Sequence, residues 1–357
     1  MEEPSDARNG VTVLVLSDPG LCTVRARSVA ERFEQELTHL YGAATVHVRT
    51  QFLGISDADT LEFGTIATLR EDYESVDVVL ILTEMPRRSH GKPEMARIFP
   101  DQSAAALSYP TLGVHAGRRR LLALFMSCVL RLVDGAPPEA RERYEPRWNR
   151  WQEPRGDEPG YLLAHTITGV PRTVLGMVAT NAPWRTAPHL STALAAAAAT
   201  GAFGVFYQSI WQMSAALSPS RLLMIGVLAI TLMVLWLILS NGLWERAEHT
   251  DPTEVFLYYN LSTVLTLFLV VLGLYLALFV VILAASLVVI DPDFMTQIMG
   301  SPVGFSNYVD IAWLSAALGV VAGGLGTSFD ETADLRQLTQ GRREMQRRPE
   351  PEQHGGR

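Results

Sequence analysis

The second half of the chain carries almost no positive charge, and this feature limits its possible folds more than any other. Between Thr186 and Leu335 the only lysine or arginine residues are Arg221 and Arg246. Charged residues make up 18% of the 357 residues, whereas soluble domains contain roughly a quarter. The chain is therefore not a single water-soluble globule, and its second half is predicted to lie in a membrane.

Long apolar runs in this half predict membrane-spanning helices. A helix needs about 20 apolar residues to cross the hydrocarbon layer, and each run is near or above this length. The predicted spans are residues 190–217, 222–240, 261–290 and 309–329. The sequence thus predicts a bundle of four transmembrane helices within residues 189–335, followed by a basic, disordered tail at residues 336–357.

The cations that flank the spans predict the orientation of the chain. Arg185 precedes the first span, Arg246 follows the second, and an arginine-rich run at residues 336–348 follows the fourth. Because positive residues stay on the cytoplasmic side, we expect both termini in the cytoplasm and a multi-pass protein of the inner membrane. Arg221, in the first outer loop, is the one cation that conflicts with this orientation.

The spans lack the usual marks of a transporter, which are ionisable groups or broken helices at mid-depth. Asp291, Asp293 and Asp310 fall at the ends of spans, where we expect them to be solvated. Gly319 and Gly323 favour close packing of the fourth span, within the bundle or between protomers of a homo-oligomer. The sequence of the spans therefore favours a closely packed bundle that anchors the protein in the membrane over a bundle that forms a pore.

The front half alternates between strand-like and helix-like segments, which is typical of a parallel sheet covered by helices on both faces. The predicted strands are residues 11–16, 45–49, 76–83 and 104–109, and the predicted helices are residues 24–40, 57–74 and 113–133. We expect residues 1–136 to form a cytosolic, Rossmann-like α/β domain with a small doubly wound parallel sheet of strand order 2-1-3-4.

Residues 137–188 are rich in proline, arginine and tryptophan and are predicted to form a collar between the two halves. Residues 161–170 and 173–179 alternate around Pro171, which favours a β-hairpin. Trp148, Trp151 and Trp184 are candidates for the headgroup level of the membrane.

A ligand site is expected at one edge of the predicted sheet. Doubly wound sheets bind ligands at the carboxyl ends of the strands, where the strand order reverses, which here lies between the first and third strands. Asp18 and Gly20 follow the first strand, and Thr83 and Glu84 end the third. These residues are candidates for ligand binding.

Positive side chains are predicted near the same edge. Arg87, Arg88 and Lys92 belong to a predicted loop of about 20 residues, and loops of that length are often functional. Arg118 and Arg119, together with the next arginine, open a predicted helix whose N-terminus also favours anions. The basic residues are therefore candidates for an anionic small molecule, with anionic lipid headgroups or plain solvent as the alternatives.

Familiar catalytic motifs are missing from the sequence. It contains no phosphate-binding P-loop, no strand-linked dinucleotide fingerprint, no nucleophile elbow and no zincin motif. Asp18, Glu84 and His90 are weak candidates for an acid or base. Cys22 and Cys128 have no metal-ligand spacing, so no metal site is predicted and both thiols are expected to be reduced.

Several segments resemble a family of uncharacterised bacterial membrane proteins from GC-rich genomes. They are residues 16–20 (LSDPG), 82–88 (LTEMPRR), 91–93 (GKP), 176–178 (GMV), 181–184 (NAPW) and 243–246 (LWER). Members often carry the label methylenetetrahydrofolate dehydrogenase. This chain has Ala182 where the family usually has arginine, and it lacks the Tyr-x-x-x-Lys pair of such enzymes, because Arg88 stands four residues before its only lysine, Lys92.

The leading hypothesis is a non-enzymatic inner-membrane protein whose cytosolic domain binds an anionic small molecule or a protein partner at the membrane surface. A membrane-tethered enzyme acting on a nucleotide or folate-linked substrate is the alternative, and a transporter component is the third. The sequence does not identify a cofactor. The net charge of −8 argues against nucleic acid as a partner.

Overall fold

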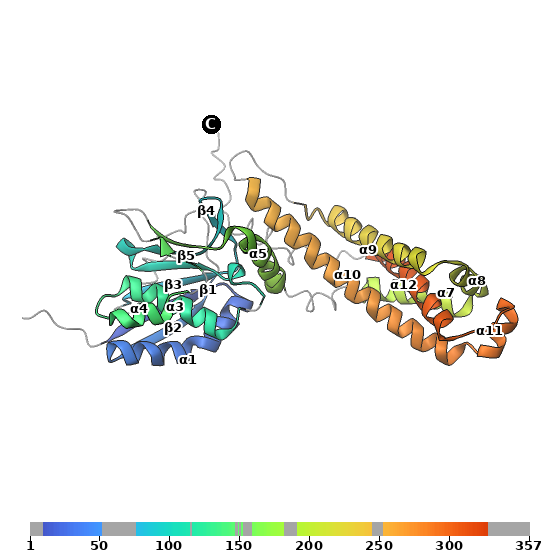
Figure 1. Ribbon diagram of the computed structural model, residues 1–357, viewed down its shortest axis with the longest axis horizontal. Coiled ribbons are helices and arrows are strands. Elements are labelled where there is room, and N and C mark those ends of the chain that lie inside the picture. The colour runs from blue at the N-terminus through green and yellow to red at the C-terminus, as the bar shows by residue number, and fades with distance from the viewer. Residues whose placement is uncertain are drawn as a thin grey trace, which may run out of the picture. The chain divides into compact units, whose positions relative to one another are not determined.

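The chain forms two compact units (Figure 1). The structure is a computed structural model and describes residues 10–51, 76–114, 116–146, 149, 151–152, 159–181, 191–244 and 253–327. The α/β unit comprises residues 1–180, 247–259 and 340–357, and the helical unit comprises residues 181–246 and 260–339. The predicted helix at residues 57–74, Trp148, Trp184 and the tail at 336–357 lie outside the described residues.

A mixed sheet forms the centre of the α/β unit. Its strands are β1 (Val11–Ser17), β2 (Ala44–Thr50), β3 (Val78–Thr83), β4 (Arg87–Ser89), β5 (Lys92–Phe99), β6 (Ala104–Ser108), β7 (Trp151–Gln152) and β8 (Gly160–Leu163). The strand order is β2-β1-β3-β6-β5-β8-β7, and β4 pairs with β5. Strands β2, β1, β3 and β6 are mutually parallel, whereas β4, β5, β7 and β8 pair in antiparallel fashion.

The strand order 2-1-3-4 predicted from the sequence thus describes only the parallel part of a larger sheet. The main reason is the segment after Glu84, which the sequence analysis treats as one long loop and which instead forms the β4–β5 hairpin. His90 and Gly91 occupy its turn, with φ of 52° and 71°. Positive φ at both central residues is the type I′ geometry that matches the twist of a hairpin. The loop prediction was therefore wrong.

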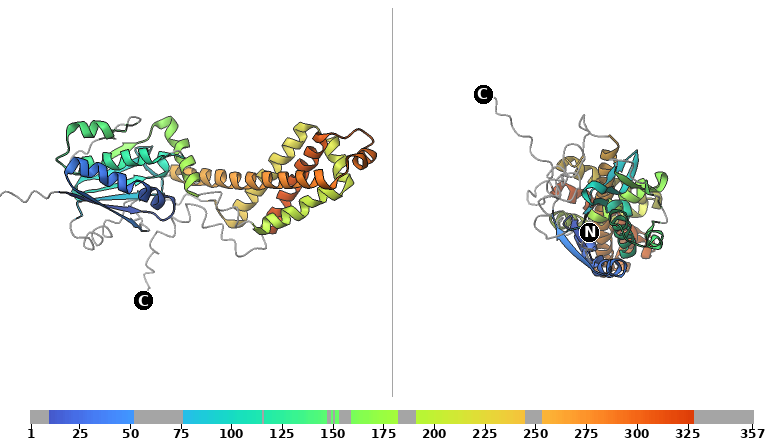
Figure 2. Two further views of the ribbon diagram at one scale, coloured as in Figure 1. Left: turned by 90° about the horizontal axis from the view of Figure 1, so that it is seen from below. Right: turned by 90° about the vertical axis from the view of Figure 1, so that its left-hand side faces the viewer.

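Helices cover one face of this sheet. They are α1 (Leu21–Tyr41) and α3 (Arg118–Leu132), and further helices of the unit are η1 (Pro100–Gln102), η2 (Pro110–Leu112), α4 (Pro138–Tyr144) and α5 (Thr166–Asn181). The left view of Figure 2 shows α1 and α3 on the same side of the strands. Phe33 and Phe125 join them in the core, with ring centroids 5.3 Å apart. Burial of such side chains is the main stabilising contribution to this layer.

Helix α5 replaces the hairpin that the sequence predicted around Pro171. Its buried residues include Gly169, Thr173, Met177 and Asn181, which recur every four residues and so share one helix face. The prediction failed because three of these four residues are not strongly apolar, so their four-residue spacing does not stand out as an apolar helix face. The nearby valine, threonine and leucine residues instead suggested the alternation of a strand.

The helical unit is organised around its last helix. Its helices are α7 (Ser191–Phe206), α8 (Gln208–Ala216), α9 (Pro219–Asn241), α10 (Thr253–Val289, whose first residues belong to the α/β unit), α11 (Pro292–Met299) and α12 (Phe305–Thr327). Helix α12 packs against α7, α8 and α9. The Tyr275 hydroxyl of α10 donates a hydrogen bond to the Trp313 carbonyl of α12 at 2.9 Å.

Three described helices are long and apolar enough to cross a membrane, namely Pro219–Asn241, Leu257–Val289 and Phe305–Gly323. The first of the four predicted spans, residues 190–217, is not a continuous helix in the described residues, because the backbone is extended at Tyr207 between α7 and α8. The Trp211 indole N–H donates to the Gly204 carbonyl at 2.9 Å and so satisfies an acceptor at the end of α7. The apolar helices indicate association with a membrane.

Small residues bring α12 close to α7. A Cβ atom on Gly319 would lie 2.6 Å from the Ala197 carbonyl oxygen, and one on Gly204 would overlap the Ser315 side chain. The predicted close packing at Gly319 is thus made within the helical unit. Contacts of this kind take the place of the hydrophobic effect in helix association within lipid.

Replacing Gly319 with alanine is expected to destabilise the helical unit by about 1–3 kcal/mol, because the new methyl group must push α7 away. The measurement is the thermal unfolding midpoint of the full chain in detergent. Gly273→Ala in α10 is the matched control, since a Cβ there meets open space. Equal midpoints for the two variants would contradict the packing argument.

Candidate functional site

The carboxyl ends of the parallel strands β1 and β3 lie side by side. This is the point where the order in which the chain adds strands to the sheet reverses, from β1–β2 on one side to β3–β6 on the other. Asp18 follows β1, and Thr83 and Glu84 end β3. The Asp18 Oδ2 atom accepts hydrogen bonds from the Thr83 hydroxyl at 2.7 Å and from the Glu84 backbone N–H at 2.9 Å. All three residues are buried. Reversal points of this kind are the usual ligand sites of open α/β sheets.

The loop after β1 is a tight connection into α1. Gly20 stands immediately before α1 with φ of 101°, which favours glycine over other residues. The Thr23 hydroxyl donates to the Asp18 carbonyl at 2.8 Å, which ties the first turn of the helix back to the strand. Hydrogen bonds to its carboxylate and to its backbone carbonyl therefore fix the position of Asp18.

Tyr109 extends this network to the next strand. Its backbone N–H donates to the Thr83 carbonyl at 2.9 Å. Burial raises the pKa of Tyr109, while the hydrogen-bonded guanidinium of Arg25 acts in the opposite direction. The ends of β1, β3 and β6 are thus linked, and a partly buried arginine from α1 lies against them.

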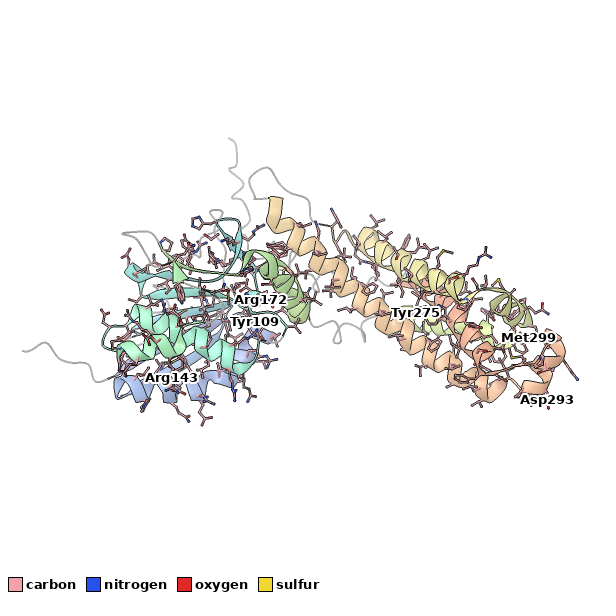
Figure 3. The ribbon with its side chains drawn as sticks, viewed as in Figure 1. Tyr109, Arg143, Arg172, Tyr275, Asp293 and Met299 are labelled. Carbon is pink, nitrogen blue, oxygen red and sulfur yellow. The ribbon has the colours of Figure 1, made fainter. Side chains whose placement is uncertain are left out.

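Helix α5 brings a second arginine to this region through unusually close backbone contacts. A Cβ atom on Gly176 would overlap the carbonyl oxygen of Pro110 in η2, so only glycine allows this approach. One turn earlier, the Arg172 side chain crosses Gly113, where a Cβ atom would lie 2.6 Å from the Arg172 Cγ atom. Figure 3 shows Arg172 and Tyr109 at this part of the α/β unit, with Arg143 apart from them.

The described surroundings of Arg172 offer its charge a thioether and a like charge. Its Nη2 atom donates to the Met95 sulfur at 3.5 Å, and its Nε atom is buried without a hydrogen-bond partner. Within the part of the chain that the structure describes, Arg172 forms no ion pair. Burial lowers the pKa of Arg172, and the nearby positive charge of Arg120 lowers it further. Such an arrangement favours an anion.

The basic residues predicted from the sequence have different surroundings. Arg87 is buried beside Glu94, with its Nε atom 3.6 Å from Oε1. Arg88 donates to the Gly91 carbonyl, and its guanidinium carbon lies 5.0 Å from the centre of the Tyr258 ring. Arg87 and Arg88 thus have protein partners. Lys92 is partly buried at the start of β5, whereas Arg118 and Arg119 are exposed in the first turn of α3.

The candidate acid and base residues are only partly brought together. Asp18 and Glu84 are adjacent, as described above, whereas His90 lies in the exposed hairpin turn, with its ring centroid 5.4 Å from that of Tyr161. Cys22 and Cys128 are buried, and neither forms a disulfide bond within the described residues. In the described residues, no group of three or more potential metal ligands was found.

Arg25 and Arg172 were missed as site residues by sequence reasoning. Arg25 follows the strand-to-helix turn, and its position in the first turns of α1 was the available signal. Arg120 was expected near the sheet edge together with Arg118 and Arg119, whereas Arg172 was hidden because its segment was interpreted as a hairpin. Comparisons of the chain with protein-family models, with curated proteins and with solved structures give no match.

Proposed function

We propose that the protein is a multi-pass inner-membrane protein whose cytoplasmic α/β unit binds a small anionic ligand at the carboxyl edge of its sheet. The ligand class is a molecule that bears phosphate or carboxylate groups. The observation that carries the proposal is the half-buried Arg172, which has no ion pair among the described residues and experiences the positive charge of the exposed Arg120.

The argument rests on the cost of burying charge. A guanidinium removed from water is destabilising unless an opposite charge or hydrogen-bond acceptors compensate it. Arg172 has a thioether as its acceptor and a like charge as its neighbour. An anion placed between Arg172 and Arg120 would remove the repulsion and accept charge-assisted hydrogen bonds.

Neighbouring groups support the same ligand. Arg120 lies in the first turn of α3, a 15-residue helix whose N-terminal dipole also favours negative charge. Arg25 adds a second partly buried guanidinium, hydrogen-bonded to the Tyr109 hydroxyl. The arginines that flank the spans support the cytoplasmic location, since positive residues tend to remain on that side of the membrane.

The test is thermal unfolding of the full chain in detergent, with and without inorganic phosphate, a nucleoside triphosphate or a dicarboxylate. A ligand that binds only the folded state stabilises it by about 2.7 kcal/mol at a concentration of 100 times Kd. We expect at least one probe to raise the unfolding midpoint, and Arg172→Gln to abolish this rise. The free Arg172→Gln protein is expected to be at least as stable as the parent, because an uncompensated buried charge is removed.

Arg143→Gln is the matched control. Arg143 is an exposed arginine of α4, away from the site (Figure 3), so its variant should retain the full response to the ligand. An equal response in Arg172→Gln and Arg143→Gln would place the ligand elsewhere. No response to any probe in the parent protein would refute the proposed site.

A further inference from the structure

In the part of the helical unit that the structure describes, the charged residues lie at one end. In its described residues the charged side chains are Arg221, Asp291, Asp293 and Asp310. The Trp313 indole N–H donates to the Leu222 carbonyl at 2.8 Å, which places the first turn of α9 level with the early part of α12. The Tyr308 hydroxyl donates to the Ile290 carbonyl at 3.1 Å, which places the end of α10 at the start of α12. The four charged residues therefore lie at a similar height along the axes of the packed helices.

Two short helices, α8 and α11, lie at this same end (Figure 1). Helix α7 runs antiparallel to α12, because Ala197 lies against Gly319 whereas Gly204, nearer the end of α7, lies against Ser315. The chain beyond the break at Tyr207 consequently continues beside the beginning of α12, and α8 packs there. Helices α8 and α11 contact each other through Trp211 and Phe294, with ring centroids 6.1 Å apart.

The surface of this end mixes aromatic and polar side chains. The large exposed side chains here include Tyr207 (54%), Met213 (47%), Phe294 (48%) and Phe305 (63%). Exposed polar residues stand between them, namely Gln208, Gln212 and Asp293. Aromatic and apolar side chains interspersed with polar groups suit neither bulk water nor the hydrocarbon core, and they are typical of the interfacial layer of a membrane.

We infer that α8, α11 and the first two turns of α12 form an interfacial cap, which inserts its exposed aromatic side chains into the glycerol and headgroup layer of a phospholipid bilayer. The occupant of this surface is lipid because the surface is continuous with the lipid-facing sides of the apolar helices and coincides with the level where charged residues begin. The inference rests on the membrane insertion of α9, α10 and α12, and it is independent of the anion site.

The test measures the depth of spin labels in the full chain, reconstituted into vesicles of phosphatidylethanolamine and phosphatidylglycerol. Single cysteines replace Phe294 and Phe305 in the cap, Asp293 as the water-facing control, and Val280, an exposed residue within α10, as the hydrocarbon control. The parent chain is the labelling blank. Its Cys22 and Cys128 are buried, and burial raises the pKa of Cys128 to about 12, so neither thiol should react.

We expect oxygen to relax the label strongly at Val280→Cys and a water-soluble nickel chelate to relax it strongly at Asp293→Cys. Labels at Phe294→Cys and Phe305→Cys should fall between these two limits. Cap labels as accessible to nickel as Asp293→Cys would overturn the inference, because the cap would then face water. Line broadening at Phe294→Cys that disappears on dilution with unlabelled protein would overturn it in favour of a second copy. A nickel-accessible Val280→Cys would remove its basis, since α10 would not be inserted.

Discussion

Replacement of Glu94 by glutamine is expected to lower the free energy of unfolding of the α/β unit by about 3–5 kcal/mol, the usual effect of breaking a buried ion pair. Glu94 is completely buried. Its carboxylate accepts hydrogen bonds from Arg97, with Nη2 to Oε2 at 2.6 Å, and lies 3.6 Å from Arg87 Nε. The glutamine would leave two largely buried guanidinium groups without this opposite charge.

The measurement is the thermal unfolding midpoint of the full chain in detergent, which should fall by roughly 10 °C. Glu139→Gln is the control, because Glu139 is an exposed acidic residue of α4. The double variant Glu94→Gln with Arg97→Gln should recover part of the loss, since only one of the two guanidiniums then remains. An unfolding midpoint of Glu94→Gln equal to that of Glu139→Gln would show that the ion pair contributes little to stability.

The second large effect is expected at Gly176. The methyl group of Gly176→Ala would overlap the Pro110 carbonyl oxygen, so α5 must shift away from η2. Overpacking of this kind typically costs about 1–3 kcal/mol. The shift would also displace Arg172, which lies one turn earlier on α5, so the response of the unfolding midpoint to the anionic ligand should be lost as well.

Both effects can be measured in one thermal titration of the full chain with the probe that stabilises the parent. Leu175→Ala is the control, because Leu175 is the neighbouring residue and its side chain is exposed. That variant should retain the response. A Gly176→Ala protein that keeps the parental midpoint and the parental response would mean that the close contact between α5 and η2 does not position Arg172.

The parallel core of the sheet and the reversal point could be predicted because their signals are local. The apolar runs of β1 and β3 mark buried strands, and Gly42, with φ of 82°, ends α1 where the sequence predicts it. Since Asp18 and Glu84 directly follow the two strands, their meeting at one edge follows from parallel pairing.

The antiparallel part and the second arginine could not be predicted in this way. Strand β5 contains Pro93, Glu94 and Arg97, which obscure the alternation of apolar residues. The burial of Glu94 depends on its ion pairs with Arg97 and Arg87 rather than on hydrophobicity. The His90-Gly91 turn was the one local signal of the hairpin. Arg172 reaches the site only through contacts of α5 with η2, which no local pattern reveals.

The break at Tyr207 has a consequence for how the protein adapts to bilayers of different thickness. The 16 residues of α7 measure about 24 Å, less than the hydrocarbon thickness of about 30 Å, whereas the 23 residues of α9 or α12 measure about 35 Å. A straight helix meets such a mismatch by tilting or by deforming the surrounding lipid. Here the segment cannot lengthen through α8, because α8 packs against α12 and the Trp211 indole N–H is hydrogen-bonded to the Gly204 carbonyl across the break, so α7 remains the shorter element. We therefore expect hydrophobic mismatch to be absorbed on the α7 side of the helical unit.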